Sequence, residues 1–232
     1  MIHSRFSGAE TRPSGDAVAF LDIETTGLSA GAGTLVFLIG VATIRPNLIE
    51  TRQYFLNEPS VEAALLIEVA ARLAQCDALV TFNGRSFDVP LLLSRYDLHQ
   101  MADPTPGRHV DLLHLARRVW GRRLRRSNLA TLEARVLGVV RDYDVPGSEA
   151  PDRYYRFLRD RNAEGIMPVF EHNRRDLLSM IQLAIRLGQM LGAAPTASDV
   201  GPSDLLGLGS LFEDAAQFAS ARECYETALV GA

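Results

Sequence analysis

Three β-strand signals in the first quarter of this 232-residue chain constrain its fold more than any other feature. Apolar runs rich in β-branched and aromatic residues mark strands at 17–23, 35–44 and 48–56. Glycines between 27 and 33, and Arg45-Pro-Asn47, supply the turns that separate them. The pattern predicts an antiparallel meander.

Beyond the meander, helix and strand signals alternate. Ser60 and Ser86 are expected to cap the first two helices. The expected elements are helices at 60–75 and from 86 past Tyr96, strands at 78–82 and 109–111, and helices at 112–120, 128–137, 151–160 and 168–191. An antiparallel meander followed by this alternation predicts an α/β fold with a mixed five-stranded sheet flanked by helices.

Composition divides the chain into four parts. Residues 1–16 are polar and rich in glycine and serine, which predicts a flexible tail. Residues 17–191 hold the predicted α/β domain, and 192–203 have the composition of a linker. The alanine spacing within 204–232 resembles the second helix of a tetratricopeptide repeat, which predicts a short helical hairpin. Because one repeat cannot bury its own face, this hairpin is a candidate contact for a protein partner, or the natural chain continues past residue 232.

Bulk properties exclude several classes of protein. The hydrophobic content of 47% and charged content of 22% are ordinary for a soluble globular protein. The longest apolar run, 35–44, is about half of what spans a bilayer, and the first residues lack the apolar stretch of a signal peptide. The two cysteines form no C-x-x-C pair. We expect a cytoplasmic protein with no membrane partner.

The basic residues are unevenly distributed. A net charge of −4 argues against a nucleic-acid partner, but all 24 basic residues are arginine and six of them fall within 117–126. We call this segment the basic cluster. The arginine fork matches phosphate bidentately, so the cluster is a candidate track for a nucleic-acid backbone, the alternative being a solvated charged face. The candidate contacts are Arg122, Arg123, Arg125 and Arg126.

Asp22 and Glu24 end the first predicted strand. Side chains two apart on a strand share one face, so both carboxylates project together. Two adjacent carboxylates repel each other unless a cation lies between them. The pair therefore predicts a divalent-metal site, and the alternative is an acidic strand end that faces solvent.

Three later polar residues extend this pattern. Asp88 follows the fourth predicted strand and opens a helix, where a carboxylate also acts as a capping charge. Asp176 lies on the long helix at 168–191, and His172 precedes it by one turn on the same face. The alternatives are an exposed acid for Asp176 and a surface or N-capping histidine for His172. Asp111 is expected to cap the helix that begins at 112.

In this order, D-x-E, N-G-x-x-x-D and H-x-x-x-D resemble the motifs of the DEDD-type 3′→5′ exonucleases, a branch of the ribonuclease H-like superfamily. The chain resembles the YprB-like ribonuclease H-like proteins more closely, over roughly residues 17–190. That likeness includes the segments 110–118, 129–138, 154–155 and 171–174, and a trailing tetratricopeptide segment occurs in that group. The resemblance implies a ribonuclease H-like fold and a metal-dependent nuclease, above all a 3′→5′ exonuclease of single-stranded DNA or RNA.

The resemblance also implies roles for individual residues. Asp22, Glu24, Asp88 and Asp176 would hold two Mg²⁺ or Mn²⁺ ions, which prefer carboxylate oxygens. His172 would be the general base. In these exonucleases a histidine base stands five residues before the last aspartate, and a tyrosine base stands four residues before it. His172 stands four residues before Asp176, which is the spacing of the tyrosine. Thr25, Thr26 and Leu28 would lie beside the terminal nucleotide.

Two residues near Asp88 carry weaker predictions. Asn83 is a candidate hydrogen-bonding partner of the scissile region, or simply a turn residue. Phe87 is a candidate for stacking on a base, or a core aromatic.

Two other functions fit the same residues. One is a non-catalytic nucleic-acid-binding or scaffold module that recruits protein partners through the helical segment, with vestigial acids. The other is a structure-specific endonuclease. The presence of all four acids favours an enzyme. A phosphate-binding loop of the G-K-[S/T] type is excluded because the chain contains no lysine.

Overall fold

The computed structural model describes residues 17–27, 33–45, 48–141, 145–192 and 200–230. The predicted tail at 1–16, most of the predicted linker at 192–203 and Leu28 lie outside these residues.

Five strands form one mixed sheet in the order β3-β2-β1-β4-β5. The strands are β1 (Val18–Thr25), β2 (Val36–Arg45), β3 (Leu48–Phe55), β4 (Ala78–Thr81) and β5 (Arg108–Asp111). The first three pair antiparallel, whereas β4 lies parallel to β1 and β5 parallel to β4. The predicted mixed five-stranded sheet is therefore confirmed.

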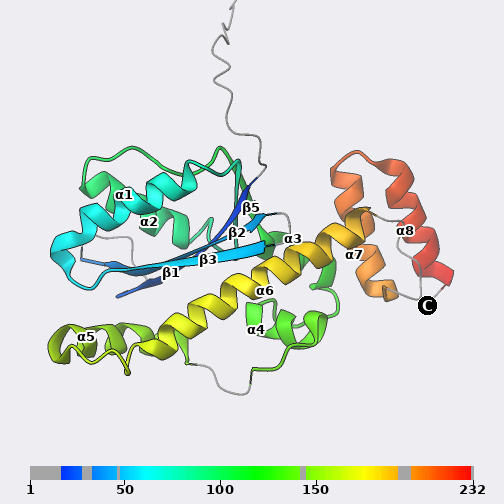
Figure 1. The fold of residues 1–232 in the computed structure, drawn as a ribbon. Coiled ribbons are helices and arrows are strands. Elements are labelled where there is room, and N and C mark those ends of the chain that lie inside the picture. The colour runs from blue at the N-terminus through cyan, green and yellow to red at the C-terminus, as the bar shows by residue number, and fades with distance from the viewer. Residues whose placement is uncertain (1–16, 28–32, 46–47, 142–144, 193–199, 231–232) are drawn as a thin grey trace, which may run out of the picture.

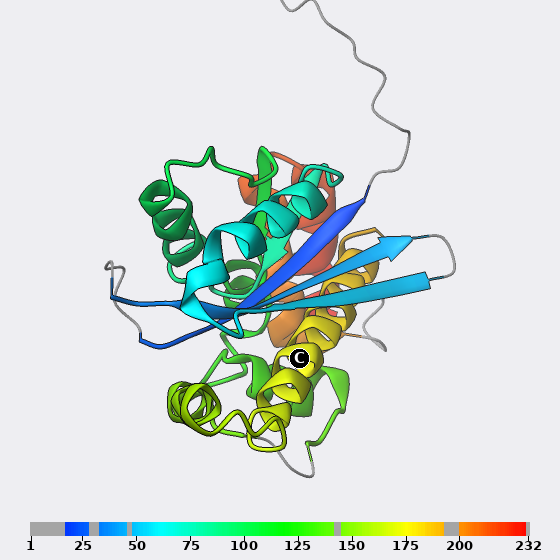
Figure 2. The same cartoon turned by 60° about the vertical axis from the view of Figure 1, so that its left-hand side comes forward.

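Helices cover both faces of this sheet, with α1 and α2 above it in Figure 1 and α6 running across the other face, as the turned view in Figure 2 also shows. The helices are α1 (Glu62–Leu73), α2 (Asp88–Leu98), α3 (Leu112–Trp120), α4 (Leu129–Leu132), α5 (Ala150–Asp160), α6 (Met167–Gly192), α7 (Pro202–Asp214) and α8 (Phe218–Val230). Among the described elements, α6 contacts β1, β2 and β3. It thus crosses all three strands of the meander.

Strand β1 divides its side chains between two hydrophobic clusters. Ala19 and Leu21 pack with residues of α1 and α2, whereas Phe20 packs with residues of α3 and α6. Because side chains alternate along a strand, Asp22 and Glu24 share the face of Phe20. Both acids therefore project from the sheet on the side of α6.

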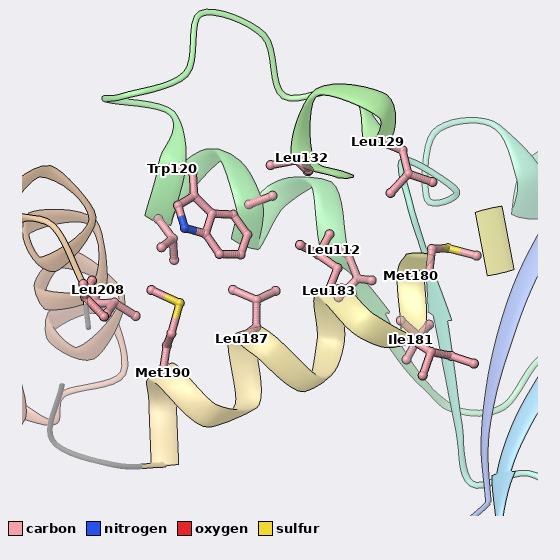
Figure 3. Close-up of a cluster of buried hydrophobic side chains, with 14 of the residues drawn as sticks. Leu112, Trp120, Leu129, Leu132, Met180, Ile181, Leu183, Leu187, Met190 and Leu208 are labelled. Atoms are coloured by element: carbon pink, nitrogen blue, oxygen red, sulfur yellow. The ribbon is translucent and has the colours of Figure 1, made fainter. Parts of the chain in front are cut away.

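The C-terminal helical hairpin α7–α8 packs against α3 and shares a hydrophobic cluster with it (Figure 3). In that cluster Trp120 of α3 and Leu187 and Met190 of α6 lie near Leu208 of α7. Gly207 permits the close approach, because a Cβ atom there would fall 2.4 Å from the carbonyl oxygen of Arg118. The predicted helix pair is present, and its assignment to the tetratricopeptide class stays a prediction.

The two serine caps predicted from the sequence are wrong. A 3₁₀ turn (Pro59–Val61) precedes α1, so this helix begins at Glu62 without a side-chain cap. Helix α2 begins at Asp88, and the backbone N–H of Ser86 donates to the carbonyl of Asn83 in the preceding turn. The prediction for Asp111 is confirmed, since its carboxylate accepts from the N–H of Leu113 at 3.0 Å and caps α3.

The predicted helix at 128–137 is α4 followed by one π-helical turn (Glu133–Leu137). Asn128 caps its start, and Gly138 ends it in the left-handed conformation with φ of 68°. Within this turn Glu133 is 1% exposed.

No helix in the described part of the chain is long and apolar enough to cross a membrane.

Candidate active site

Four carboxylates approach one another around the end of β1. Asp22 and Glu24 come from the strand, Asp88 from the first residue of α2 and Asp176 from the middle of α6. The pKa of Asp22 is raised well above its usual range, first by burial and then by the charges of Asp176, Glu24 and Asp88. The structure thus brings together the four acids that the sequence singled out.

Asp88 is held beside the other acids by a backbone contact. Strand β4 ends at Thr81, before the level of Ile23, and the N–H of Ile23 donates to Oδ1 of Asp88 at 3.2 Å. This N–H lies between Asp22 and Glu24 in the chain. Burial raises the pKa of Asp88 to about 7, an effect that two backbone hydrogen bonds only partly offset. A capping role at the start of α2 and a place in the acidic cluster are therefore compatible.

His172 and Asp176 lie one turn apart on α6, with Nε2 of the histidine 3.6 Å from Oδ2 of the aspartate. Arg141, which the sequence did not single out, reaches both of them. Its Nη2 donates to Oδ1 of Asp176 at 2.5 Å, and its Nη1 lies 3.4 Å from Nδ1 of His172. Burial raises the pKa of Asp176, and the charges of His172 and Arg141 partly offset this. The surface alternatives for His172 and Asp176 are wrong, since each side chain is only 17% exposed.

Glu133 orients Arg141 from the opposite side. The two side chains form a bidentate pair, with Nε to Oε2 at 2.7 Å and Nη2 to Oε1 at 2.5 Å. The buried acid of the π-helical turn therefore fixes a guanidinium group at the edge of the carboxylates. No local sequence signal marks this pair, because Asp176, which Arg141 contacts, lies 35 residues from Arg141 in the chain.

The donor set fits a hard divalent cation. Carboxylate oxygens from β1, α2 and α6 approach one another, and burial and the neighbouring acids raise the pKa of Asp22. Within the described residues, no three histidine, cysteine or acidic side chains are gathered tightly enough to hold a metal ion as they stand. Arg141 contacts Asp176 within this cluster.

The predicted contacts of the terminal nucleotide lie at the end of β1. The hydroxyl of Thr25 donates to the carbonyl of Gly27 at 2.6 Å, and that of Thr26 accepts from the N–H of Leu35 at 2.9 Å. Both threonines thus shape the turn that follows the acids, and Leu28 lies outside the described residues.

Asn83 and Phe87 flank the turn that precedes α2. Asn83 has a left-handed backbone with φ of 64°, and its N–H donates to Oδ1 of Asp111 at 2.8 Å, so its role in the turn is confirmed. Phe87 is 43% exposed beside Asp88, so the core alternative for this aromatic residue is wrong.

The basic cluster is divided between protein contacts and open surface. Arg123 bonds both carboxylate oxygens of Asp204 at 3.0 Å, and Arg118 forms an ion pair with Asp214, so these two arginines attach α7. Arg125 and Arg126 instead line two adjoining pockets of about 660 and 560 Å³. Arg123 also lines the first of these pockets, in addition to its contact with Asp204.

The second of these pockets reaches the end of β4. It is lined by Phe82 and Asn83 at the end of β4 as well as by Arg125 and Arg126. In the parallel pairing of β1 with β4, Phe20 lies opposite Val80, so Asp22 and Phe82 follow at the same level.

The fold and the acidic cluster define an α/β protein of the ribonuclease H-like class, and the comparison of sequences specifies the family. The chain belongs to the RNase H superfamily, whose RNase_H_2 family model matches residues 19–188. It is similar to YprB of Bacillus subtilis (strain 168), described as an uncharacterized protein, with 36% identity over 174 residues. That match covers 74% of this chain and 42% of YprB, so the chain spans less than half the length of this relative.

Two solved structures resemble the fold. The family B DNA polymerase of the archaeon Pyrobaculum calidifontis matches with a TM-score of 0.54 and 15% identity, over 89% of this chain and 30% of the polymerase. The zinc-bound complex of Escherichia coli ExoI with single-stranded DNA matches with a TM-score of 0.49 and 12% identity, over 75% of this chain and 40% of ExoI. At these identities the likeness concerns the fold alone.

Proposed function

We propose that the chain is a metal-dependent nuclease, and specifically a 3′→5′ exonuclease that hydrolyses single-stranded DNA or RNA. The observation that carries this proposal is the approach of Asp22, Glu24, Asp88 and Asp176 to one another around the end of β1. These four residues would hold two Mg²⁺ or Mn²⁺ ions. The ions would supply Lewis acidity and lower the pKa of a bound water.

Other groups of the chain would support hydrolysis. His172, held beside Asp176 and Arg141, would accept the proton of the attacking water. Arg141 carries a positive charge to the point where an anionic phosphate must approach four carboxylates, and its bidentate contact with Glu133 keeps it there. The general base thus lies between a carboxylate and a guanidinium.

Substrate would be positioned by residues around the acids. Phe87 is exposed beside Asp88 and would stack on a base. Asn83, Thr25, Thr26 and Leu28 would contact the terminal nucleotide. Arg122, Arg125 and Arg126 would contact the phosphate backbone, whereas Arg123 would act mainly through its contact with Asp204.

A labelled oligonucleotide tests the proposed activity. A single strand labelled at its 5′ end should yield, with Mn²⁺, a ladder of products shortened from the 3′ end, and chelation with EDTA should abolish it. Cleavage of circular single-stranded DNA would replace the exonuclease proposal with an endonuclease. A wild-type protein that binds the strand but cleaves neither DNA nor RNA with any divalent metal would overturn the nuclease proposal and favour the non-catalytic module.

The two pocket-lining arginines provide a separate prediction. Replacing both Arg125 and Arg126 with alanine should weaken binding of single-stranded DNA and reduce the salt slope of log K by about 1.4, because each phosphate contact contributes about 0.7. Binding is measured by fluorescence anisotropy at several salt concentrations. Arg222 of α8, 77% exposed and remote in sequence from the basic cluster, is the control, and R222A should leave the slope unchanged. An unchanged slope in the double variant would contradict the proposed track.

A further inference from the structure

We propose that Asn173, itself oriented by Gln53, is the positioning residue that sets the carboxylate of Asp22 for metal binding. Asn173 is fully buried on α6, three residues before Asp176. Its side-chain amide contacts Asp22 rather than any group of its own helix. The inference rests on the metal site of the proposed function and adds to it a residue that is not a ligand.

The sheet register places the partners of Asn173 in one row. Asp22 of β1 lies opposite Gly40 of β2, which in turn lies opposite Gln53 of β3. Residues opposite each other in antiparallel strands share a face, so Asp22 and Gln53 flank the glycine on the side of α6. A Cβ atom at Gly40 would fall 2.2 Å from Oδ1 of Asn173. The missing side chain therefore provides the space in which the amide bridges its two neighbours.

The hydrogen bonds of this row have a fixed direction. The carbonyl oxygen of Phe170 only accepts, so Gln53 must present Nε2 there, at 2.7 Å. The same Nε2 donates to Oδ1 of Asn173 at 2.8 Å. Asn173 is thereby left with Nδ2 facing Asp22, where it donates to the backbone oxygen at 3.1 Å and to Oδ2 at 2.7 Å. The groups at the two ends of this row, the carbonyl of Phe170 and the oxygens of Asp22, are acceptors, which determines the orientation of the two amides between them.

Such a contact suits a metal ligand among like charges. Glu24, Asp88 and Asp176 repel Asp22, so an Asp22 side chain that was free to rotate would turn away from them. The amide holds both the carboxylate and the carbonyl of Asp22, which restrains the side chain in one rotamer. Because it is neutral, it orients the negative charge without neutralising it, whereas a cation at the same place would compete with the metal. Groups that orient metal ligands typically contribute about 10- to 100-fold in metal affinity.

Manganese binding tests this inference directly, without a catalytic assay. Mn²⁺ titrated into the protein and followed by electron paramagnetic resonance should bind N173L and Q53M about 10- to 100-fold more weakly than the wild type. The smaller change, Q53M, removes only the donor that orients Asn173, so it keeps the inference testable where N173L does not fold. Q182L, at an exposed position on the same helix, is the matched control and should bind like the wild type. The rate of cleavage by Q53M at saturating Mn²⁺ should return to that of the wild type, since the ligands themselves are intact.

Two outcomes are distinguished. A wild type that binds no Mn²⁺ overturns the proposed metal site and this inference with it. A wild type that binds Mn²⁺, with folded Q53M binding within about twofold of it, overturns this inference alone.

Discussion

Replacing Asp176 with asparagine should lower the rate of metal-dependent cleavage by about 1,000-fold while the protein stays folded. Asparagine keeps the shape of the side chain and an oxygen that can accept from Arg141, but it loses the charge that a hard cation requires. A catalytic ion contributes several kcal/mol to the stabilisation of the transition state, and about 1.4 kcal/mol corresponds to a factor of ten in rate. Single-turnover cleavage of a 3′-terminal phosphodiester measures the effect.

The control for this variant lies on the same helix. Glu171 pairs with Arg174 and Arg175 at the surface of α6, so E171Q removes one acid from the helix without touching the cluster. We expect its rate to stay within about twofold of the wild type, since surface ion pairs contribute little. If D176N and E171Q cleave equally well, the four acids do not form the catalytic centre.

Manganese should also raise the melting temperature of the wild type by roughly 5–11 °C when present at about a hundred times its dissociation constant. Binding to the folded state alone adds about 2.7 kcal/mol under that condition, and a chain of this size gains about 2–4 °C for each kcal/mol. Differential scanning fluorimetry with and without EDTA measures it.

The raised pKa of Asp88 makes the increase in melting temperature with Mn²⁺ depend on pH. Its pKa is raised to about 7 in the folded state from an ordinary value of 3.8, so the folded state binds more protons between these values. The stabilising contribution of the protonated group is present below pH 3.8 and is lost as the pH rises through about 7. The metal-free protein should therefore lose stability over this interval, and the gain from Mn²⁺ should be larger at about pH 8 than at about pH 5.5.

The variant D88N provides the control for the pH dependence. Its amide oxygen can still accept from the N–H of Ile23, but it carries no titrating charge. Metal-free D88N should be more stable than the wild type at about pH 8, with the difference shrinking toward about pH 5, and its response to Mn²⁺ should be reduced. A wild-type response to Mn²⁺ in D88N would show that Asp88 does not hold the ion.

The sheet and the four acids could be predicted because each has a local signature. Apolar runs and turn residues delimit the strands of the meander, and Asp22 and Glu24 share a face through the two-residue period of a strand. His172 and Asp176 are related by one turn of helix in the same way. These regularities place side chains within one element. That Asp88 and Asp176 join Asp22 and Glu24 in one site was implied by the resemblance to the DEDD-type exonucleases.

The contacts that organise the acids have no such signature. Gln53 and Asn173 lie 120 residues apart, and nothing in either segment points to the other. Glu133 is buried at ordinary helical spacing from Leu129 and Leu132, but nothing near it in the chain indicates that it pairs with Arg141. Ser86 failed as a cap for a related reason, because the position of Asp88 depends on the N–H of a distant strand. Long-range partners of this kind become visible only in the folded chain.

Gly40 also bears on how the sequence can change over evolution. Where α6 crosses β2 at this glycine, a Cβ atom would lie 2.2 Å from the side chain of Asn173 and 2.8 Å from that of Leu177, so these two side chains pack directly on the backbone of the strand. The distance of α6 from β2 is therefore set at a position where the strand has no side chain. Apolar residues elsewhere in the core can be exchanged for others of similar volume without moving the two halves of the site apart. We expect substitutions to accumulate among those residues while position 40 stays fixed.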